Sequence, residues 1–231
     1  LLVFILQTSP SSALETNKNF PIIHILATAD IALVVSELAR IYSHSEKVNV
    51  LGNFDNTTAL IQDIEEGTPA DIIITSHPKW IKILKQKGSI DVTSTYEIFY
   101  DKLVFIAANS DAKLPKFAVI EKYPEYKFLL PQEENTSLSL YLNEIVFKDP
   151  VINKLSNIQL IKTTGNTNKL LLSNPKFFSI NFYSNIYDDQ EYKIIGEVPN
   201  NTIKPIAYNV SIIATENSEK VDKFLTFLKS E

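Results

Sequence analysis

The first hundred residues alternate between short apolar runs and longer stretches in which apolar residues recur every three or four positions. Short continuous apolar runs are typical of buried strands, and the longer spacing is typical of helices that pack one face on a sheet. In the stretch from Ile31 to Tyr42 the apolar residues follow helical spacing, and Asp30 is a candidate N-cap. The order strand–helix, three times over, predicts a parallel sheet with right-handed crossovers. The predicted strands are 22–26, 48–51 and 72–74, and the predicted helices are 31–42, 59–66 and 78–87.

The rest of the chain carries apolar segments that are less regularly spaced. Residues 205–214 alternate between apolar and polar positions, which predicts a late strand, and 221–228 predict a closing amphipathic helix. The polar residues 52–58 predict a loop, and residues 109–131 are expected to be irregular. Further strands are predicted at 103–108, 158–161 and 177–183, and further helices at 138–146 and 168–173.

The late strand decides how the chain divides into domains. We expect it to return to the edge of the first sheet, so that residues 21–102 and 206–231 form one lobe and residues 103–205 form another. Residues 1–20 fall outside both lobes. They begin with a short apolar run, followed by small residues up to Ala13, as in the second half of a secretory signal. The alternative is a buried N-terminal strand, because the run is too short to span a bilayer.

Composition narrows the class of protein. The 231 residues are 45% hydrophobic and 21% charged, values typical of a folded chain. The net charge is −5 and no basic stripe is present, so we expect no nucleic-acid partner. The chain has no cysteine, which excludes disulfides, cysteine-based zinc sites and cysteine nucleophiles within these residues.

Polar chemistry is concentrated where the third predicted strand ends. A Gly-Thr-Pro-Ala turn leads through Asp71 into the apolar strand, which ends in Thr75 and Ser76 before a helix that closes at Gly88. In an open α/β sheet, small ligands bind at the carboxyl ends of strands beside helix N-termini. This stretch therefore predicts a ligand site at that edge of the sheet.

The same stretch resembles the signature of type II periplasmic solute-binding proteins, and in particular the molybdate-binding family of ABC importers. The resemblance implies an α/β fold of two lobes, each a mixed sheet flanked by helices, with a ligand cleft between the lobes. It also implies a site that holds a tetrahedral oxyanion by hydroxyls and backbone N–H groups at helix N-termini, without a counter-charge.

The resemblance also assigns the ligand positions of this chain. The family's first serine falls on Asp30, beside Thr28, and its second hydroxyl falls on Thr57 in the turn that begins at Asn56. Its tyrosine falls on Phe182, and Tyr183 follows it. Backbone N–H groups of the second lobe fall near Ser137 and Thr164, and Ser76 is added from the strand end. The predicted ligand-binding set is Thr28, Asp30, Asn56, Thr57, Ser76, Ser137, Thr164 and Phe182.

Two of these positions depart from the family's chemistry. An Asp30 carboxylate about 4 Å from an anion would cost ~4 kcal/mol at an effective dielectric near 20, and Phe182 lacks a hydroxyl donor. Three interpretations of Asp30 remain open. It is a helix cap turned away from the cleft, with Thr28 replacing the serine, or it contacts a cationic or donor-rich ligand, or it marks a site that has lost binding. We expect weak molybdate binding or none.

The predicted function is the periplasmic solute-binding component of an ABC importer for a molybdate- or tungstate-type oxyanion. A membrane permease is its expected partner, and we expect a monomer without cofactor or separate metal-ligand set. His77 is a further candidate contact, but no Ser-His-Asp spacing, Gly-rich phosphate loop or HExxH motif is present, which disfavours an enzyme. The alternatives are a family member with changed or lost specificity, a small-molecule enzyme on the same scaffold, and a non-transport interaction protein.

Overall fold

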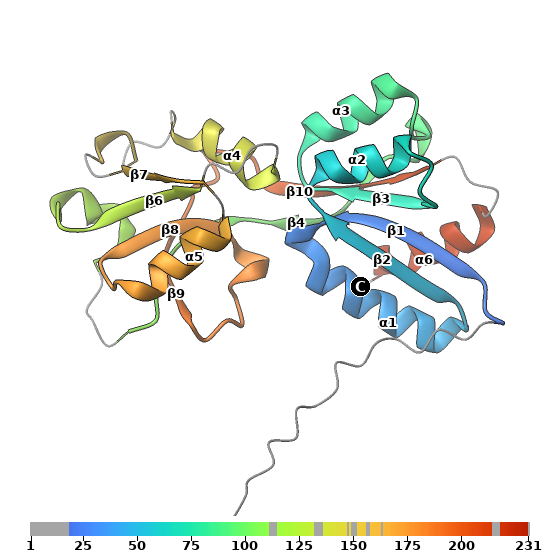
Figure 1. Ribbon diagram of the computed structural model, residues 1–231, viewed down its shortest axis with the longest axis horizontal. Helices are drawn as coiled ribbons and strands as arrows, with labels where there is room; N and C mark the ends of the chain where they lie inside the picture. Colours follow the sequence, from blue (N-terminus) through green and yellow to red (C-terminus); the bar gives the residue numbers. More distant parts are fainter. Residues whose placement is uncertain are drawn as a thin grey trace, which may run out of the picture.

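The chain folds into two mixed sheets of five strands each, which lie side by side (Figure 1). The computed structural model describes residues 19–110, 115–131, 136–146, 148, 152–155, 158–162, 164–213 and 218–230. Each sheet is covered by helices on both faces, and we call each sheet with its helices a lobe. In this described part of the chain, no helix is both long enough and apolar enough to cross a membrane.

The first sheet has the strand order β2-β1-β3-β10-β4. Its strand β1 pairs in parallel with both β2 and β3, whereas β10 runs antiparallel to its two neighbours. The late strand therefore does return to the first sheet. The strands are β1 (Ile22–Thr28), β2 (Asn49–Asp55), β3 (Ile72–Thr75), β4 (Tyr96–Asp101) and β10 (Ile206–Ile212).

Two pairs of helices cover the two faces of the first sheet, with α1 and α6 on one face and α2 and α3 on the other (Figure 1). Successive residues of β1 point to opposite faces: Ile25 packs in the core with α1 and α6, and Leu26 packs in the core with α2 and α3. Because both faces are buried, β1 and β3 are continuous apolar runs, as predicted. The helices are α1 (Ala32–Glu46), α2 (Thr57–Glu65), α3 (Pro78–Lys87) and α6 (Ser218–Ser230).

The second sheet has the order β7-β6-β8-β5-β9, and α5 packs on one of its faces while α4 and a 3-10 helix at Phe117–Lys122 pack on the other. The strand β6 is parallel to β7 and β8, and β5 is antiparallel to β8 and β9. The elements are β5 (Leu103–Ala108), β6 (Lys127–Pro131), α4 (Ser137–Val146), β7 (Ile158–Ile161), α5 (Thr164–Ser173), β8 (Phe177–Phe182) and β9 (Tyr192–Glu197).

The chain passes between the sheets twice. Only Lys102 separates β4 from β5, and residues 198–205 lead from β9 back to β10. The exact division into lobes at 102/103 and 205/206 remains a prediction.

Several predicted loops are regular structure. Residues 52–58 were expected to be a loop, but β2 continues to Asp55 because its ladder with β1 extends to the pair Thr28–Asp55, and α2 begins at Thr57. The expectation for 109–131 is also wrong, since this range includes the 3-10 helix and β6. The strands β4 and β9 were not predicted, because each lies at a sheet edge and is only partly buried, which weakens the apolar pattern.

Candidate functional site

A pocket of about 310 Å³ lies between the two lobes. Its volume is at the low end for small-molecule sites, which suits a small ion with a few waters or a small acid. Both lobes contribute to its wall, each through the ends of strands and the beginnings of helices. The lining residues are Thr28, Ala29, Asp30, Asp55, Asn56, Thr57, Thr136, Ser137, Leu138, Asn181, Phe182 and Asn185.

The first lobe builds its wall from the carboxyl ends of β1 and β2. Thr28 and Asp55 are register partners at the ends of these parallel strands, and a helix follows each strand directly. Asn56 caps α2, since its Oδ1 accepts a hydrogen bond of 3.0 Å from the backbone N–H of Ala59. This cap places Thr57 at the first position of α2, where it is buried beside the pocket.

The second lobe supplies the beginning of α4 and the end of β8. The hydroxyl of Thr136 accepts a hydrogen bond of 3.2 Å from the backbone N–H of Ser139, which caps α4 and places Ser137 in its first turn. At the end of β8, Asn181 Oδ1 accepts from the backbone N–H of Phe182 at 2.8 Å and from the Asn185 side chain at 3.4 Å. Because Oδ1 is engaged in this way, the side-chain NH2 of Asn181 is the group that can donate a hydrogen bond to a ligand.

Three buried hydroxyls around this pocket have no hydrogen-bond partner among the described residues. They belong to Thr28, Thr57 and Ser137. Thr28 is the last residue of β1, and Thr57 and Ser137 are the first residues of α2 and α4. Buried hydroxyls in folded proteins almost always have a partner. Their convergence on one pocket therefore indicates a ligand that accepts hydrogen bonds.

Asp30 lies in a 3-10 turn at Ala29–Ile31, just before α1, and it lines the pocket. Its Oδ2 accepts hydrogen bonds from the hydroxyls of Ser76 at 2.8 Å and Tyr208 at 3.1 Å (the donor residues are 0% and 2% exposed). The prediction that Asp30 caps the helix is wrong: Ile31 is at the N-cap of α1, and no side chain caps it. The carboxyl is turned instead toward two donors from the central strands.

The surroundings of Asp30 favour its neutral form. Burial raises the pKa of the Asp30 carboxyl, and the hydroxyls of Thr28, Ser76 and Tyr208 offset only part of this shift. The Thr28 hydroxyl lies close enough to the carboxyl to favour its ionised form, although it makes no hydrogen bond of good geometry in the described structure. Burial and the nearby Asp30 also raise the pKa of Tyr208 well above its usual range, so this phenol stays a neutral donor.

The structure brings most of the predicted ligand residues together, while ligand contact itself stays a prediction. Ser76 lies behind Asp30 rather than on the pocket wall, and Thr164 is the first residue of α5. The Thr164 side chain is outside the described structure. The predicted residues that line the pocket are Thr28, Asp30, Asn56, Thr57, Ser137 and Phe182.

Sequence reasoning missed four polar lining residues: Asp55, Thr136, Asn181 and Asn185. Asp55 follows a strand directly and could have been recognised if the end of that strand had been placed correctly. Asn181 is buried within an aromatic-rich strand, and Asn185 lies in the turn after it, so neither is marked by a pattern in the sequence. In the part of the chain that the structure describes, no group of three His, Asp or Glu side chains could hold a metal ion.

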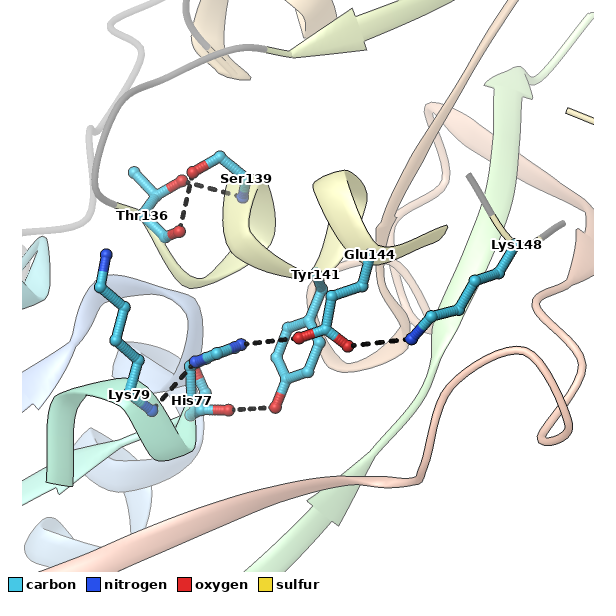
Figure 2. Close-up of polar contacts among 8 residues, drawn as sticks. His77, Lys79, Thr136, Ser139, Tyr141, Glu144 and Lys148 are labelled. Atoms are coloured by element: carbon cyan, nitrogen blue, oxygen red, sulfur yellow. Dashed lines mark hydrogen bonds and ion pairs between the residues drawn. The ribbon is translucent and has the colours of Figure 1, made fainter. Parts of the chain in front are cut away.

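Next to the pocket, α4 of the second lobe contacts the turn between β3 and α3 of the first (Figure 2). The Tyr141 hydroxyl donates to the backbone carbonyl of Ser76 at 2.6 Å, and His77 Nε2 lies 3.5 Å from a Glu144 carboxylate oxygen. His77 Nδ1 accepts from the backbone N–H of Lys79 at 3.1 Å and so caps α3. His77 therefore joins the lobes and caps a helix, and it is not a lining residue of the pocket.

Comparison with known proteins places this architecture in a family. The family model described as bacterial extracellular solute-binding protein matches residues 23–231. The molybdate-binding protein ModA of Escherichia coli K12 is 22% identical over 218 residues, which cover 90% of this chain and 83% of that protein.

Solved structures share the fold at low sequence identity. The substrate-binding domain of a putative molybdenum ABC transporter from Clostridium difficile has a TM-score of 0.78 and 21% identity, with 91% of this chain and 93% of that chain covered. The periplasmic molybdate-binding protein of Azotobacter vinelandii has a TM-score of 0.72 and 15% identity, with 90% and 92% covered. With two mixed sheets, a pocket between them and a family match over nearly the whole chain, this protein belongs to the bacterial extracellular solute-binding proteins.

Proposed function

We propose that this chain is the periplasmic solute-binding component of an ABC importer and that its solute is a small tetrahedral oxyanion of the molybdate or tungstate type. The observation that carries the proposal is the set of three buried, unpartnered hydroxyls around the pocket between the lobes, those of Thr28, Thr57 and Ser137. A tetrahedral oxyanion has acceptor oxygens in several directions and can satisfy donors from both lobes at once.

Helix N-termini add to the attraction for an anion. Thr57 opens α2 and Ser137 opens α4, and both line the pocket. Backbone N–H groups in the first turn of a helix lack partners within the helix and carry partial positive charge. Such groups bind an anion without a lysine or arginine, and the described lining residues include neither.

A transport role also fits the way in which the lobes meet. A ligand that hydrogen-bonds Thr57 in one lobe and Ser137 in the other stabilises the closed arrangement more than the open one. A membrane permease can then distinguish the loaded protein from the empty one by its shape. The relatives named as molybdate-binding proteins support this role and this class of solute.

Changed specificity within the same role is the second candidate, and Asp30 favours it. A carboxyl on the pocket wall and a phenylalanine at position 182 both disfavour a fully ionised oxyanion compared with the hydroxyl donors that the family resemblance implies. An enzymatic role has less support, because the described lining residues include no histidine or lysine to act as a general base near the hydroxyls.

The proposal is tested by titration calorimetry with molybdate, tungstate, sulfate and phosphate on the purified protein. Thr57→Val should weaken oxyanion binding about tenfold or more, because it removes a buried donor to a charged ligand. Thr75→Val is the matched control: Thr75 Oγ1 is also buried and unpartnered in the described structure, but Thr75 does not line the pocket. Equal losses in the two variants, or turnover of an anion in place of stoichiometric binding, would contradict the proposal.

A further inference from the structure

One acidic group in the pocket is at odds with a site built to donate hydrogen bonds to an anion. Asp30 lines the same pocket as the unpartnered hydroxyls of Thr28, Thr57 and Ser137. Its carboxyl is held in place on the protein side, because Oδ2 accepts from both Ser76 and Tyr208. An ionised carboxylate at this position would present a further acceptor, with negative charge, to a ligand that is itself anionic.

We propose that the protein binds its oxyanion together with one proton, which is held between the Asp30 carboxyl and an oxygen of the ligand. This inference rests on the proposed function and extends it to the protonation state of the solute. The proton converts a contact between two acceptors into a charge-assisted O–H···O hydrogen bond, which is short and strong. For each anion bound, the balance is one proton taken from water or carried in by the anion.

The hydrogen bonds of Asp30 indicate where that proton lies. Each carboxylate oxygen has two lone-pair sites, and the two sites on Oδ2 are occupied by the hydroxyl donors Ser76 and Tyr208. The Thr28 hydroxyl and the backbone N–H of Asp30 also act on the carboxyl, and Oδ1, which neither Ser76 nor Tyr208 engages, is the oxygen we assign to the proton. Ser76 and Tyr208 are almost fully buried, so the carboxyl cannot exchange these donors for water without disrupting the core.

Burial favours proton uptake by Asp30, and the groups around it supply hydrogen-bond donors but no counter-charge. Tyr208 from β10 and Tyr141 from α4 interact with Asp30 as neutral phenols whose pKa values are raised. Asp55 also lines the pocket, and Asp101 acts on Tyr208, so the other acidic groups of this region offer Asp30 no positive partner. No lysine, arginine or histidine is among the groups that act on Asp30 in the described structure.

Solutes differ in where they obtain the proton. Molybdate, tungstate and sulfate carry none at neutral pH, so above the pKa of Asp30 in the free protein their binding must take one up. Monohydrogen phosphate already carries one and can donate it to Asp30. The site therefore selects oxyanions that bring a hydroxyl, or accepts fully ionised oxyanions with a dependence on pH.

The test is calorimetry with molybdate between pH 5.5 and 8.5. Each titration is repeated in two buffers of different ionisation enthalpy, and the difference in binding enthalpy gives the number of protons taken up. For the wild type we expect close to one proton per molybdate at pH 8, and an affinity that falls about tenfold for each pH unit at the alkaline end. Monohydrogen phosphate at pH 8 should bind with no net uptake. Asp30→Asn should bind molybdate with no uptake and with an affinity independent of pH, since an amide donates without titrating.

Asp55→Asn is the matched control, because it removes the other pocket carboxylate that the structure describes. Its affinity should change by a similar factor at every pH, and its proton count should stay close to one. Molybdate binding by the wild type without proton uptake overturns the inference and leaves the proposed function standing. Failure of both the wild type and Asp30→Asn to bind molybdate, tungstate, sulfate or phosphate at any pH overturns the proposed function and the inference with it. If Asp30→Asn does not fold, the proton count of the wild type alone decides.

Discussion

The Tyr141 hydroxyl donates a hydrogen bond of 2.6 Å to the backbone carbonyl of Ser76, so a side chain of the second lobe binds the main chain of the first (Figure 2). Ser76 in turn donates its own hydroxyl to Asp30 on the pocket wall. The contact between the lobes and the ligand site therefore share one residue. Closure of the lobes and the position of the Asp30 carboxyl are expected to depend on each other.

Loss of the Tyr141 hydroxyl should weaken closure. Tyr141→Phe leaves the Ser76 carbonyl without its donor, at a cost of about 1–3 kcal/mol when the carbonyl stays buried. We expect ligand affinity to fall by about tenfold and the ligand-induced decrease in the radius of gyration to become smaller, as measured by small-angle scattering. Tyr100→Phe is the control, because the Tyr100 hydroxyl donates a hydrogen bond to the exposed Glu97 in the same strand, β4, and so does not join the lobes. An unchanged affinity in Tyr141→Phe would show that this contact does not contribute to closure.

His77 should make the protein less stable in mild acid. Burial lowers the pKa of His77, and the nearby Glu144 offsets only part of that shift. Because the unfolded chain then binds a proton more readily than the folded one, stability is highest above the unfolded pKa of about 6.5 and falls as the pH drops through it toward the lower folded value.

His77→Asn isolates this contribution, because asparagine still caps α3 but does not titrate. The melting temperature of this variant should change less between pH 7 and pH 5 than that of the wild type, in thermal unfolding followed by circular dichroism. Parallel curves for the two proteins would mean that other groups cause the acid sensitivity.

Restoring the donors that the family resemblance implies should tighten binding of a fully ionised oxyanion. Asp30→Ser removes a carboxyl that must be protonated before a fully ionised oxyanion can bind beside it, and Phe182→Tyr adds a hydroxyl donor. At pH 8 we expect the double variant to bind molybdate at least a hundredfold more tightly than the wild type, by calorimetry. Wild-type binding as tight as that of the double variant would show that neither residue limits affinity.

The cap of α2 should matter for both stability and binding. Asn56→Ala removes the acceptor of the Ala59 N–H and should lower the free energy of unfolding by about 0.5–2 kcal/mol. Asn56→Ser keeps a capping oxygen and should retain most of that stability. Oxyanion affinity should fall in the alanine variant as well, because the cap fixes the first turn of α2, where Thr57 lies. Denaturant unfolding and calorimetry on the same samples check both effects.

The sequence predicts most of the buried strands and the helices of this fold, because their apolar patterns reflect burial. The buried strand β6 is an exception, since it lies in the stretch 109–131 that was expected to be irregular. The strands β1 and β3 are predominantly apolar since both faces are covered, and α3 begins at Pro78 and ends before Gly88, where a positive φ of 69° suits glycine. The strands β4 and β9 were missed because edge strands pair on one side only and expose part of their side chains.

The pocket was predicted in part for a different reason. Thr28 lies at the end of β1 and Thr57 at the start of α2. Both elements have a clear local pattern, so these two positions could be predicted from the sequence. The orientation of Asp30 could not, because it is fixed by Tyr208, which lies 178 positions further along the chain. A helix cap and a buried pocket carboxyl have the same local sequence, and only the tertiary fold distinguishes them.

The single residue between β4 and β5 limits how the lobes can move. Lys102 is bonded on both sides, since its N–H donates to Asp101 Oδ1 at 2.7 Å and its carbonyl accepts from the N–H of Tyr183 at 2.8 Å. A link this short permits torsion about a few backbone bonds but almost no translation of one sheet along the other. The second connection, residues 198–205, is longer and can follow that torsion. Relative movement of the lobes is thus expected to be mainly rotation about the backbone bonds near Lys102, so a ligand held by both lobes fixes their arrangement by fixing their relative angles.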